Sequence, residues 1–468
     1  MRFLALLLII LAIPAFVAML RSKQGFKAGC LLVGLLPFCL NALNLDAAII
    51  NWAAWPGFAK GLVVTILDSL AIAILIVHRN LLSRLPFKAV FLAYILVVAL
   101  SALSSSTPMA SLFYPAQLLR IFALFVAVAA IMQRPDGLRW IAYGLACAGV
   151  LEGAVTLSQR LGGVFQAEGT MAHQNMLGFM SHFLVLPLFA LIFAGSRKKL
   201  LWAGATGGVL AVALGASRAS IGFLVMGLVL LAMLSLWRSP TPRKWKMVGF
   251  GFVAVALAAP LAISGINQRL DSPNIEGSYN ERAAFERAAE LMLIENPMGV
   301  GANHYVVTAN VGGYSERAGV IWNAGSRAAH VHNLYLLTGA EAGWLGLFAV
   351  VALFLWPIIK GLSFSLRTDS DWRGEAALGS TVALIAAAAH SFYEWIFVSY
   401  QAQYVFAIAL GMLAGLIKQR SIERFRAMMP APTGAAKAGS DEDSVGGEGG
   451  VRRRDETFRP KRRRVPTR

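Results

Sequence analysis

The chain is poor in charge and in cysteine. Only 14% of its residues are charged and 57% are hydrophobic, whereas a soluble globular domain carries about 25% charged residues and at most about half apolar ones. This balance excludes an ordinary soluble protein and predicts a membrane protein. Cys30, Cys39 and Cys147 all lie within apolar segments, where they indicate neither a disulfide framework nor a metal site.

Apolar runs recur along almost the whole sequence, each near the roughly 20 residues that a helix needs to cross a bilayer. The first, FLALLLIILAIPAFVAML, has no small-residue cleavage site after it, so we expect a retained helix rather than a signal peptide. The fold class we predict is an all-α polytopic membrane protein with about 12 or 13 transmembrane helices. They are expected near residues 3–20, 28–44, 61–77, 88–104, 113–132, 138–157, 175–194, 200–216, 219–237, 247–265, 333–359, 375–393 and 400–417.

Lysine and arginine sort the connections between these helices into two sets. Alternate connections are rich in basic residues, and the short loops between them hold only Lys60, Arg160 and Arg218. By the positive-inside rule the basic set is cytoplasmic, and the tail at 419–468 falls on the same side. This Gly-rich, charged tail should be disordered and lie against anionic lipid headgroups. We prefer this interpretation of its arginine clusters to nucleic-acid binding.

The same alternation divides the chain into N-terminal transmembrane helices (1–265), one long outer loop (266–332) and C-terminal transmembrane helices (333–418). Within the loop, Ser278 and Glu281 have capping-box spacing, and Asn296 and Pro297 supply a stop. Phe285, Leu291, Met292 and Ile294 lie between these signals. They predict a short amphipathic helix on or near the membrane surface.

Two arginines in the outer regions are unusually placed. Arg282 falls in the first turn of the predicted loop helix, where a cation opposes the helix dipole but where a phosphate would be held well. Pairing with Glu286 at i+4 is the alternative. Arg218 lies in the tight turn SRAS between two apolar runs. It either snorkels to the interface or holds a guanidinium at the outer surface for the diphosphate of a lipid.

The stretch HVHN precedes the apolar run that starts at Leu334. Asn333 is placed to cap that helix, which puts His332 just before its first turn. His330 and His332 in an extended segment would point the same way, so a metal is one alternative, but no carboxylate or cysteine follows at ligand spacing. A histidine that only bonds a backbone carbonyl is the other.

Three further residues are weaker candidates. His173 and Asn175 stand at the outer mouth of the run at 175–194, where they either cap the helix or support a site. Arg120 lies inside an apolar run, and ionisable groups there usually face a polar interior or pair with one another. We keep all three as supporting candidates.

The segments GTMAHQNMLG, SRAS, NERAAFERAAELMLIENPMGVGANHY and HVHNLYLLTGAEAGWLGL resemble, in order and spacing, the O-antigen ligase and polymerase family. The resemblance spans about 165–350. It implies a GT-C-like, inverting glycosyltransferase of the bacterial inner membrane that needs no metal or other cofactor. Such an enzyme moves a glycan from undecaprenyl diphosphate to an acceptor on the periplasmic face.

Carried over residue by residue, the resemblance assigns Arg218 and Arg282 to the diphosphate and His332, directly before Asn333, to the acceptor hydroxyl. His330 becomes a supporting residue. Implied acceptors are lipid A-core for a ligase, another lipid-linked repeat for an O-antigen or exopolysaccharide polymerase, and a protein side chain for a protein O-oligosaccharyltransferase. We take the ligase as the first hypothesis. A membrane transporter is the alternative from another class, although the sequence shows no internal repeat of the kind common in transporters.

Overall fold

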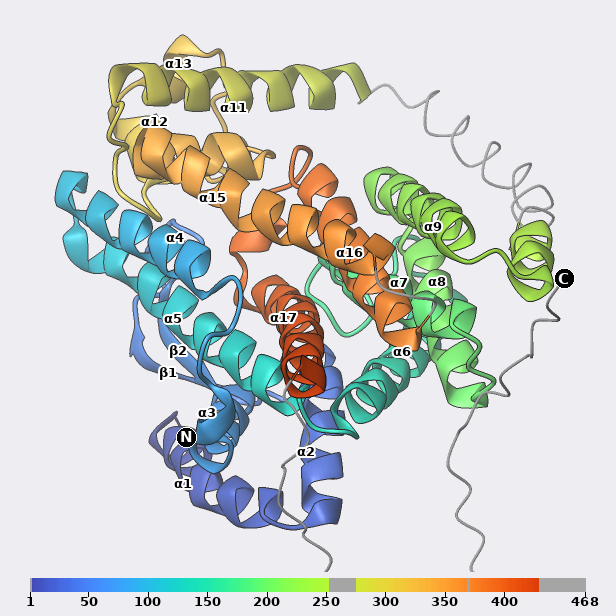
Figure 1. Cartoon of the computed structure of the whole chain (residues 1–468). Helices are drawn as coiled ribbons and strands as arrows, with labels where there is room; N and C mark the ends of the chain where they lie inside the picture. The colour runs from blue at the N-terminus through green and yellow to red at the C-terminus, as the bar shows by residue number, and fades with distance from the viewer. Residues whose placement is uncertain (1, 252–274, 368–370, 429–468) are drawn as a thin grey trace, which may run out of the picture. The chain divides into compact units, whose positions relative to one another are not determined.

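The computed structural model describes residues 2–251, 275–367 and 371–428. Helices make up most of these residues, and the strands among them form one two-stranded hairpin. The helices with assigned bounds (Figure 1) are α1 (Arg2–Leu20), α2 (Lys23–Leu35), α3 (Ile66–Val77), α4 (Lys88–Leu100), α5 (Pro108–Ile131), α6 (Gly137–Leu161), α7 (Gln174–Phe193), α8 (Lys199–Gly215), α9 (Arg218–Arg238), α11 (Ile275–Glu295), α12 (Tyr305–Val311), α13 (Tyr314–Arg317), α14 (Ala324–Arg327), α15 (Leu334–Arg367), α16 (Trp372–His390) and α17 (Tyr400–Met428).

The described helices confirm a polytopic all-α membrane fold. Seven of them, namely α1, α5, α6, α7, α9, α15 and α17, are long and apolar enough to cross a membrane, and α3, α4 and α8 are shorter apolar helices. The expected total of 12 or 13 spans is therefore not reached by length and composition in this part of the chain. The span expected at 247–265 lies mostly outside the described residues.

Two expected spans are interrupted. The run at 61–77 begins as strand β2 (Gly61–Thr65), which pairs antiparallel with β1 (Asp46–Asn51). Helix α3 starts only at Ile66, because Thr65 and Asp68 form a reciprocal capping box there. The α-helix of the run at 28–44 ends at Leu35, where a short 3₁₀ turn takes over, since the proline at position 37 has no backbone N–H to continue the helical hydrogen bonds.

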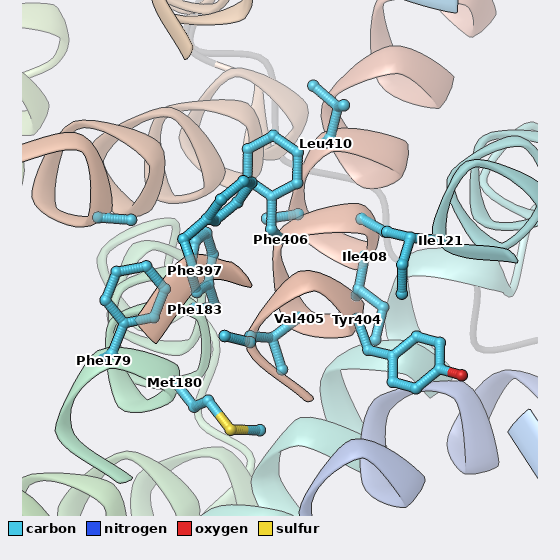
Figure 2. Packing of buried hydrophobic residues seen from close by; sticks show 14 of the residues in the cluster. Ile121, Phe179, Met180, Phe183, Phe397, Tyr404, Val405, Phe406, Ile408 and Leu410 are labelled. Atoms are coloured by element: carbon cyan, nitrogen blue, oxygen red, sulfur yellow. The ribbon is translucent and has the colours of Figure 1, made fainter. Parts of the chain in front are cut away.

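Small residues and aromatic rings organise the packing between helices. α6 lies so close to α8 that a Cβ on Gly204 would come within 2.4 Å of the Cα of Ala146, an approach that small residues allow in membrane proteins. Phe397 packs against Phe406 at a ring-centroid distance of 5.0 Å, and Phe183 reaches the same ring from α7. Figure 2 shows these rings around the start of α17, where they form a continuous buried core.

A kink in α15 fixes the loop that follows α11. Gly343 leaves the helical conformation with a φ of 69°, which frees carbonyl groups of the preceding turn. The backbone N–H groups of Val300 and Gly301 donate to the carbonyls of residues 340 and 341 at 3.1 and 2.8 Å. The carboxylate of Glu341 in turn accepts the N–H groups of Asn303 and Tyr305. The break in the helix is thus satisfied by the loop, which holds the end of α11 against α15.

The C-terminal part corrects one expectation. α17 continues to Met428, so the first residues of the predicted tail at 419–468 are helical rather than disordered. The remainder from 429 lies outside the described residues. The chain divides into one compact unit, Met1–Ile422, and a second that begins at Glu423.

Candidate functional site

A buried carboxylate gathers three polar side chains from distant parts of the chain. Glu394 follows α16, and its side chain is only 4% exposed. Its Oε2 lies 3.1 Å from Nδ1 of His332. Its Oε1 accepts the amide of Asn175 at 2.7 Å and lies 3.5 Å from Nη2 of Arg282. Three of the sequence candidates therefore converge on one acid.

The segment before α15 is held in place by its own capping. The side chain of Asn333 accepts the backbone N–H groups of Tyr335 and Leu336 at 3.0 and 3.2 Å, which satisfies donors that a helix start leaves open. The backbone N–H of Leu334 donates to the carbonyl of Ser391 at 2.9 Å. This bond joins the start of α15 to the end of α16 and brings His332 to Glu394. The predicted cap at Asn333 is confirmed.

The ring of His332 has a defined orientation. A carboxylate only accepts hydrogen bonds, so Nδ1 must be the nitrogen that donates to Glu394. In the neutral ring the proton is then absent from Nε2, which carries a lone pair. The His332 side chain is 28% exposed, so part of the ring remains accessible. The arrangement is that of a general base oriented by an acid.

Arg282 reaches Glu394 from α11, and its position corrects two expectations. The helix begins at Ile275 rather than after Ser278, so Arg282 lies about two turns inside it. The dipole argument for a phosphate at a helix N-terminus therefore does not apply. Within the described contacts, the guanidinium pairs with Glu394 and not with Glu286. It is 39% exposed, so it remains open to a ligand.

The apolar face of α11 is buried against the protein. Phe285, Ala288 and Met292 are at most 5% exposed, and α11 packs against α15. Of the expected surface-facing residues, Ile294 is 68% exposed. The apolar pattern predicts this helix, and its buried face packs against α15; its place on or near the membrane surface stays a prediction.

A pocket of about 710 Å³ opens beside these groups. Arg282 and His332 line it together with Glu286, and the rest of its wall is apolar. The remaining lining residues are Phe223, Ala283, Ala389, Phe392 and Tyr393. A mostly apolar pocket with a few convergent polar groups is the usual form of a ligand site.

The start of α7 supports this site. His173 caps the helix by accepting the backbone N–H of Asn175 at 3.1 Å, and the side chain of Asn175 is thereby turned to Glu394. His173 contributes to the helix end, and its part in a reaction stays a prediction. Asn175 is brought directly to the acid that contacts His332.

Arg218 begins α9, and its position in the turn agrees with the sequence. Ser217 caps the helix by accepting the N–H of Ser220, and Arg218 is exposed. Phe223, about 7.5 Å further along the helix axis, lines the pocket, whereas Arg218 is not among the lining residues. Its role with a diphosphate stays a prediction.

The two histidines of HVHN have different surroundings. His330 is 7% exposed and stacks on Trp395 with ring centroids 4.6 Å apart. Burial, with smaller contributions from the charges of His332 and Lys60, lowers the pKa of His330 to about 3. It is therefore neutral at ordinary pH. Because His330 packs between rings while His332 bonds Glu394, the described contacts do not bring the two rings to a common ligand.

Arg120 belongs to a separate cluster. Its Nη1 lies 2.5 Å from Oδ2 of Asp68 and 2.8 Å from the hydroxyl of Tyr404, and the same hydroxyl donates to Asp68 at 2.7 Å. The pairing expected of ionisable groups within apolar runs is observed here. Arg120 does not line the pocket, and a supporting role for it stays a prediction.

Sequence reasoning missed Glu394. It stands in SFYEW, in a turn that we expected between two spans at 393–399, but we assigned it no role. The sequence did contain a signal for it. A carboxylate at the end of a membrane span is energetically unfavourable without a partner, and the connections on this side of the membrane are otherwise poor in charge. The partners themselves lie far away in the sequence, so only the fold identifies them.

Comparison with known proteins gives two matches. Residues 203–351 match the family model described as O-Antigen ligase. The chain is also 28% identical over 224 residues to the exopolysaccharide production protein ExoQ of Rhizobium meliloti (strain 1021), an alignment covering 45% of this chain and 50% of that protein. The chain thus spans about half the length of this curated relative. The matched region contains Arg218, Arg282 and His332, and over it the chain is similar to the O-antigen ligase family.

Proposed function

We propose that this membrane protein transfers a glycan from undecaprenyl diphosphate to an acceptor hydroxyl, as an O-antigen ligase does, on the periplasmic face of the bacterial inner membrane. The observation that carries the proposal is the 3.1 Å contact between His332 Nδ1 and Glu394 Oε2 beside a pocket that Arg282 also lines. The pocket then offers a base and a cation to one ligand. The family match over 203–351 supports this assignment.

The base in this proposal is His332. An alcohol is a weak nucleophile, and a positioned imidazole can take its proton as the new glycosidic bond forms. Glu394 keeps the proton of the ring on Nδ1 and stabilises the imidazolium that results, while Nε2 receives the proton of the acceptor. Asn175 holds the carboxylate from the other side. Glu394 and Asn175 are accordingly positioning residues.

The leaving group is the lipid diphosphate, which gains negative charge as the anomeric C–O bond breaks. In the proposal Arg282 stabilises this charge, and Arg218 joins it from the start of α9. Fixed cations aimed at developing charge are among the strongest contributions to catalysis. Guanidinium groups suit a diphosphate because their donors match two oxygens at once, and the reaction proposed uses no metal ion.

A single displacement follows from one base and one leaving group. The acceptor oxygen attacks the anomeric carbon opposite the diphosphate, so the configuration at that carbon inverts. The anomeric coupling constants of the product, compared by NMR with those of the lipid-linked donor, test this step. Retention of configuration would contradict it.

The central experiment is glycan transfer by the full-length chain purified in detergent, with lipid-linked glycan and acceptor supplied. His332→Ala should lower the rate by about 100- to 10,000-fold, the contribution of a positioned base. Glu290→Ala on the exposed side of α11 is the control and should transfer normally. Unaltered transfer by His332→Ala would overturn the assignment.

The same assay separates an enzyme from a membrane transporter. Detergent removes the barrier between two compartments, so a transporter produces no net transport there, whereas a transferase still forms product. Transfer in detergent that depends on His332 therefore excludes transport as the explanation. Its complete absence with every acceptor class would favour the transporter.

An exopolysaccharide polymerase is the second candidate, favoured by the name of the Rhizobium meliloti relative. A protein O-oligosaccharyltransferase differs only in its acceptor. Glycan analysis of a deletion strain distinguishes the first two: long undecaprenyl-linked chains that accumulate unattached indicate a ligase with a lipid A-core acceptor, and single repeats indicate a polymerase. Loss of glycan from proteins alone indicates the third.

A further inference from the structure

Part of the pocket lining is made of aromatic rings at the surface of the protein. Phe392 and Tyr393 are 56% and 55% exposed, and Phe223 lines the same pocket. Large rings are usually buried for most of their surface. Three rings that line one pocket offer a ligand an aromatic surface.

The rings are held in place before any ligand arrives. Phe223 stacks on His390 with centroids 5.1 Å apart and packs against Tyr393 at 5.6 Å. Phe392 packs against Tyr335 at 4.5 Å, and the hydroxyl of Tyr335 donates to the carbonyl of Ala388 at 2.9 Å. A surface fixed in this way loses little conformational freedom on binding.

A carboxylate lines the pocket together with the aromatic rings. Glu286 lies one turn after Arg282 on α11 and lines the pocket with it, while Arg282 pairs with Glu394. A carboxylate accepts hydrogen bonds from hydroxyl groups and repels a phosphate. The Arg282 side of the pocket therefore suits an anion, and the Glu286 side suits neutral hydroxyls.

These features select among ligand classes. The faces of aromatic rings are electronegative and attract C–H groups, which both an isoprenoid chain and the C–H face of a sugar provide. An isoprenoid against the rings would leave Glu286 facing hydrocarbon without a partner, which is costly. A pyranose ring satisfies both, with its C–H face on the rings and its hydroxyls toward Glu286.

We propose that Phe392, Tyr393 and Glu286 form a subsite for a pyranose ring, namely the sugar joined directly to the carrier diphosphate. This inference rests on the proposed function, because only a diphosphate at Arg282 places that sugar beside Glu286. The subsite contributes to donor specificity, because the aromatic rings contact the C–H face of the sugar and Glu286 accepts hydrogen bonds from its hydroxyl groups.

Binding can be measured without transfer. Saturation-transfer difference NMR would use the full-length chain in lauryldimethylamine oxide, a detergent without a sugar headgroup, with methyl glycosides of glucose, galactose and N-acetylglucosamine as probes. At least one glycoside should receive saturation on its ring C–H protons. Phe392→Leu combined with Tyr393→Leu should weaken binding by about tenfold or more, and Glu286→Leu should also weaken it.

The matched control is Phe348→Leu, which removes an exposed ring of α15 that lies against Trp344 and outside the pocket. This variant should bind like the native chain, and thermal unfolding should show that all variants are folded. Absence of binding by every glycoside would overturn the subsite. The subsite would also be overturned if farnesyl phosphate, and none of the glycosides, received saturation and the ring substitutions abolished that signal.

Transfer assays keep this failure distinct from failure of the proposed function. If the native chain transfers glycan and the ring variants do so with unchanged KM for the lipid-linked donor, the function stands and the subsite fails. If only the KM for the acceptor changes, the assignment to the donor sugar fails. If glycosides bind as expected but no transfer occurs, the subsite stands and the proposed function fails.

Discussion

Two carboxylates in this chain each gather two basic side chains, yet their surroundings differ. Glu375 on α16 lies 2.9 Å from Nη1 of Arg238 and 2.7 Å from Nζ of Lys244, and all three side chains are at most 3% exposed. Glu394 is buried as well, but its partners Arg282 and His332 are 39% and 28% exposed.

The difference lies in what else the basic groups contact. Lys244 also donates to the carbonyls of Ser235 and Ser239 and to the hydroxyl of Ser239, so its donors are used within the protein. Arg282 and His332 instead line a pocket beside Glu394. A closed cluster can only hold helices together, whereas an open one can exchange a partner for a ligand. Burial of the cations, rather than of the acid, separates a structural cluster from a candidate site.

The largest effect that tests this comparison is expected at the closed cluster. Glu375→Ala leaves two buried cations without their counter-ion, and breaking a buried pair in this way costs about 3–5 kcal/mol. The variant should yield little folded protein, and its thermal unfolding in detergent should shift strongly downward. Glu394→Ala should keep most of its stability, because solvent reaches Arg282 and His332, but should lose glycan transfer.

An equal loss of folded protein in the two variants would break the comparison, since both clusters would then be structural. Glu290→Ala, which removes an exposed carboxylate of α11, provides the baseline. Fluorescence-detected size exclusion of all three variants, expressed identically, gives the readout.

The next effect is expected at the open cluster. Arg282→Ala removes the cation proposed for the leaving diphosphate and should lower the transfer rate by about 100- to 1,000-fold, with little change in unfolding temperature. Arg287→Ala is the control on the same helix: the residue is exposed, and its guanidinium donates to the carbonyl of Ala318 at 3.0 Å. Similar losses in both variants would show a general effect of charge on α11 and not a specific site.

A more selective change is Glu394→Gln, which keeps the shape and removes the charge. Arg282 then loses the carboxylate that competes with a ligand, and pyrophosphate should bind up to about fivefold more tightly, the value of a weak ion pair whose cation is exposed. Transfer should nevertheless fall by roughly 100-fold, because His332 loses the charge that stabilises its imidazolium. Calorimetric titration tests the expected gain in pyrophosphate affinity, and the transfer assay tests the expected loss of rate. Weaker pyrophosphate binding would contradict the exchange of partners.

Much of the fold followed from periodicity and punctuation. The start of α15 at Leu334, the turn before α9 and the end of α11 at Glu295 all lie where the caps and stops placed them. The hairpin of β1 and β2 was not predicted, because the apolar residues of β2 continue into the run at 61–77 and resemble part of a membrane span. The start of α11 also differed, since a capping-box spacing does not prevent a helix from beginning earlier.

The candidate site was foreseen in its residues more than in its arrangement. His332, Arg282 and Asn175 were each identified from the sequence, but the acid that joins them was not. Glu394 lies 62 positions from His332 and 219 from Asn175 along the chain. Contacts at such separations depend on helix packing, which one sequence without its fold does not reveal. The aromatic rings of the pocket were missed for the same reason.

The smallest effect concerns the packing that carries Glu394. The ring of His330 stacks on Trp395, the residue after Glu394, and its pKa is lowered from 6.5 to about 3 by burial. The unfolded chain therefore binds a proton below about pH 6.5 that the folded chain does not, so stability falls as the pH falls. The free energy of unfolding should therefore be about 2 kcal/mol lower at pH 5 than at pH 7.

His330→Phe keeps a ring against Trp395 and removes the titrating group. Its unfolding temperature should fall less between pH 7 and pH 5 than that of the native chain, and glycan transfer at pH 7 should be nearly unchanged. If instead both chains showed the same dependence on pH, His330 would accept a proton in the folded state and would need a path to solvent. The buried His330 would then no longer differ from the accessible His332, and it would become a second candidate base.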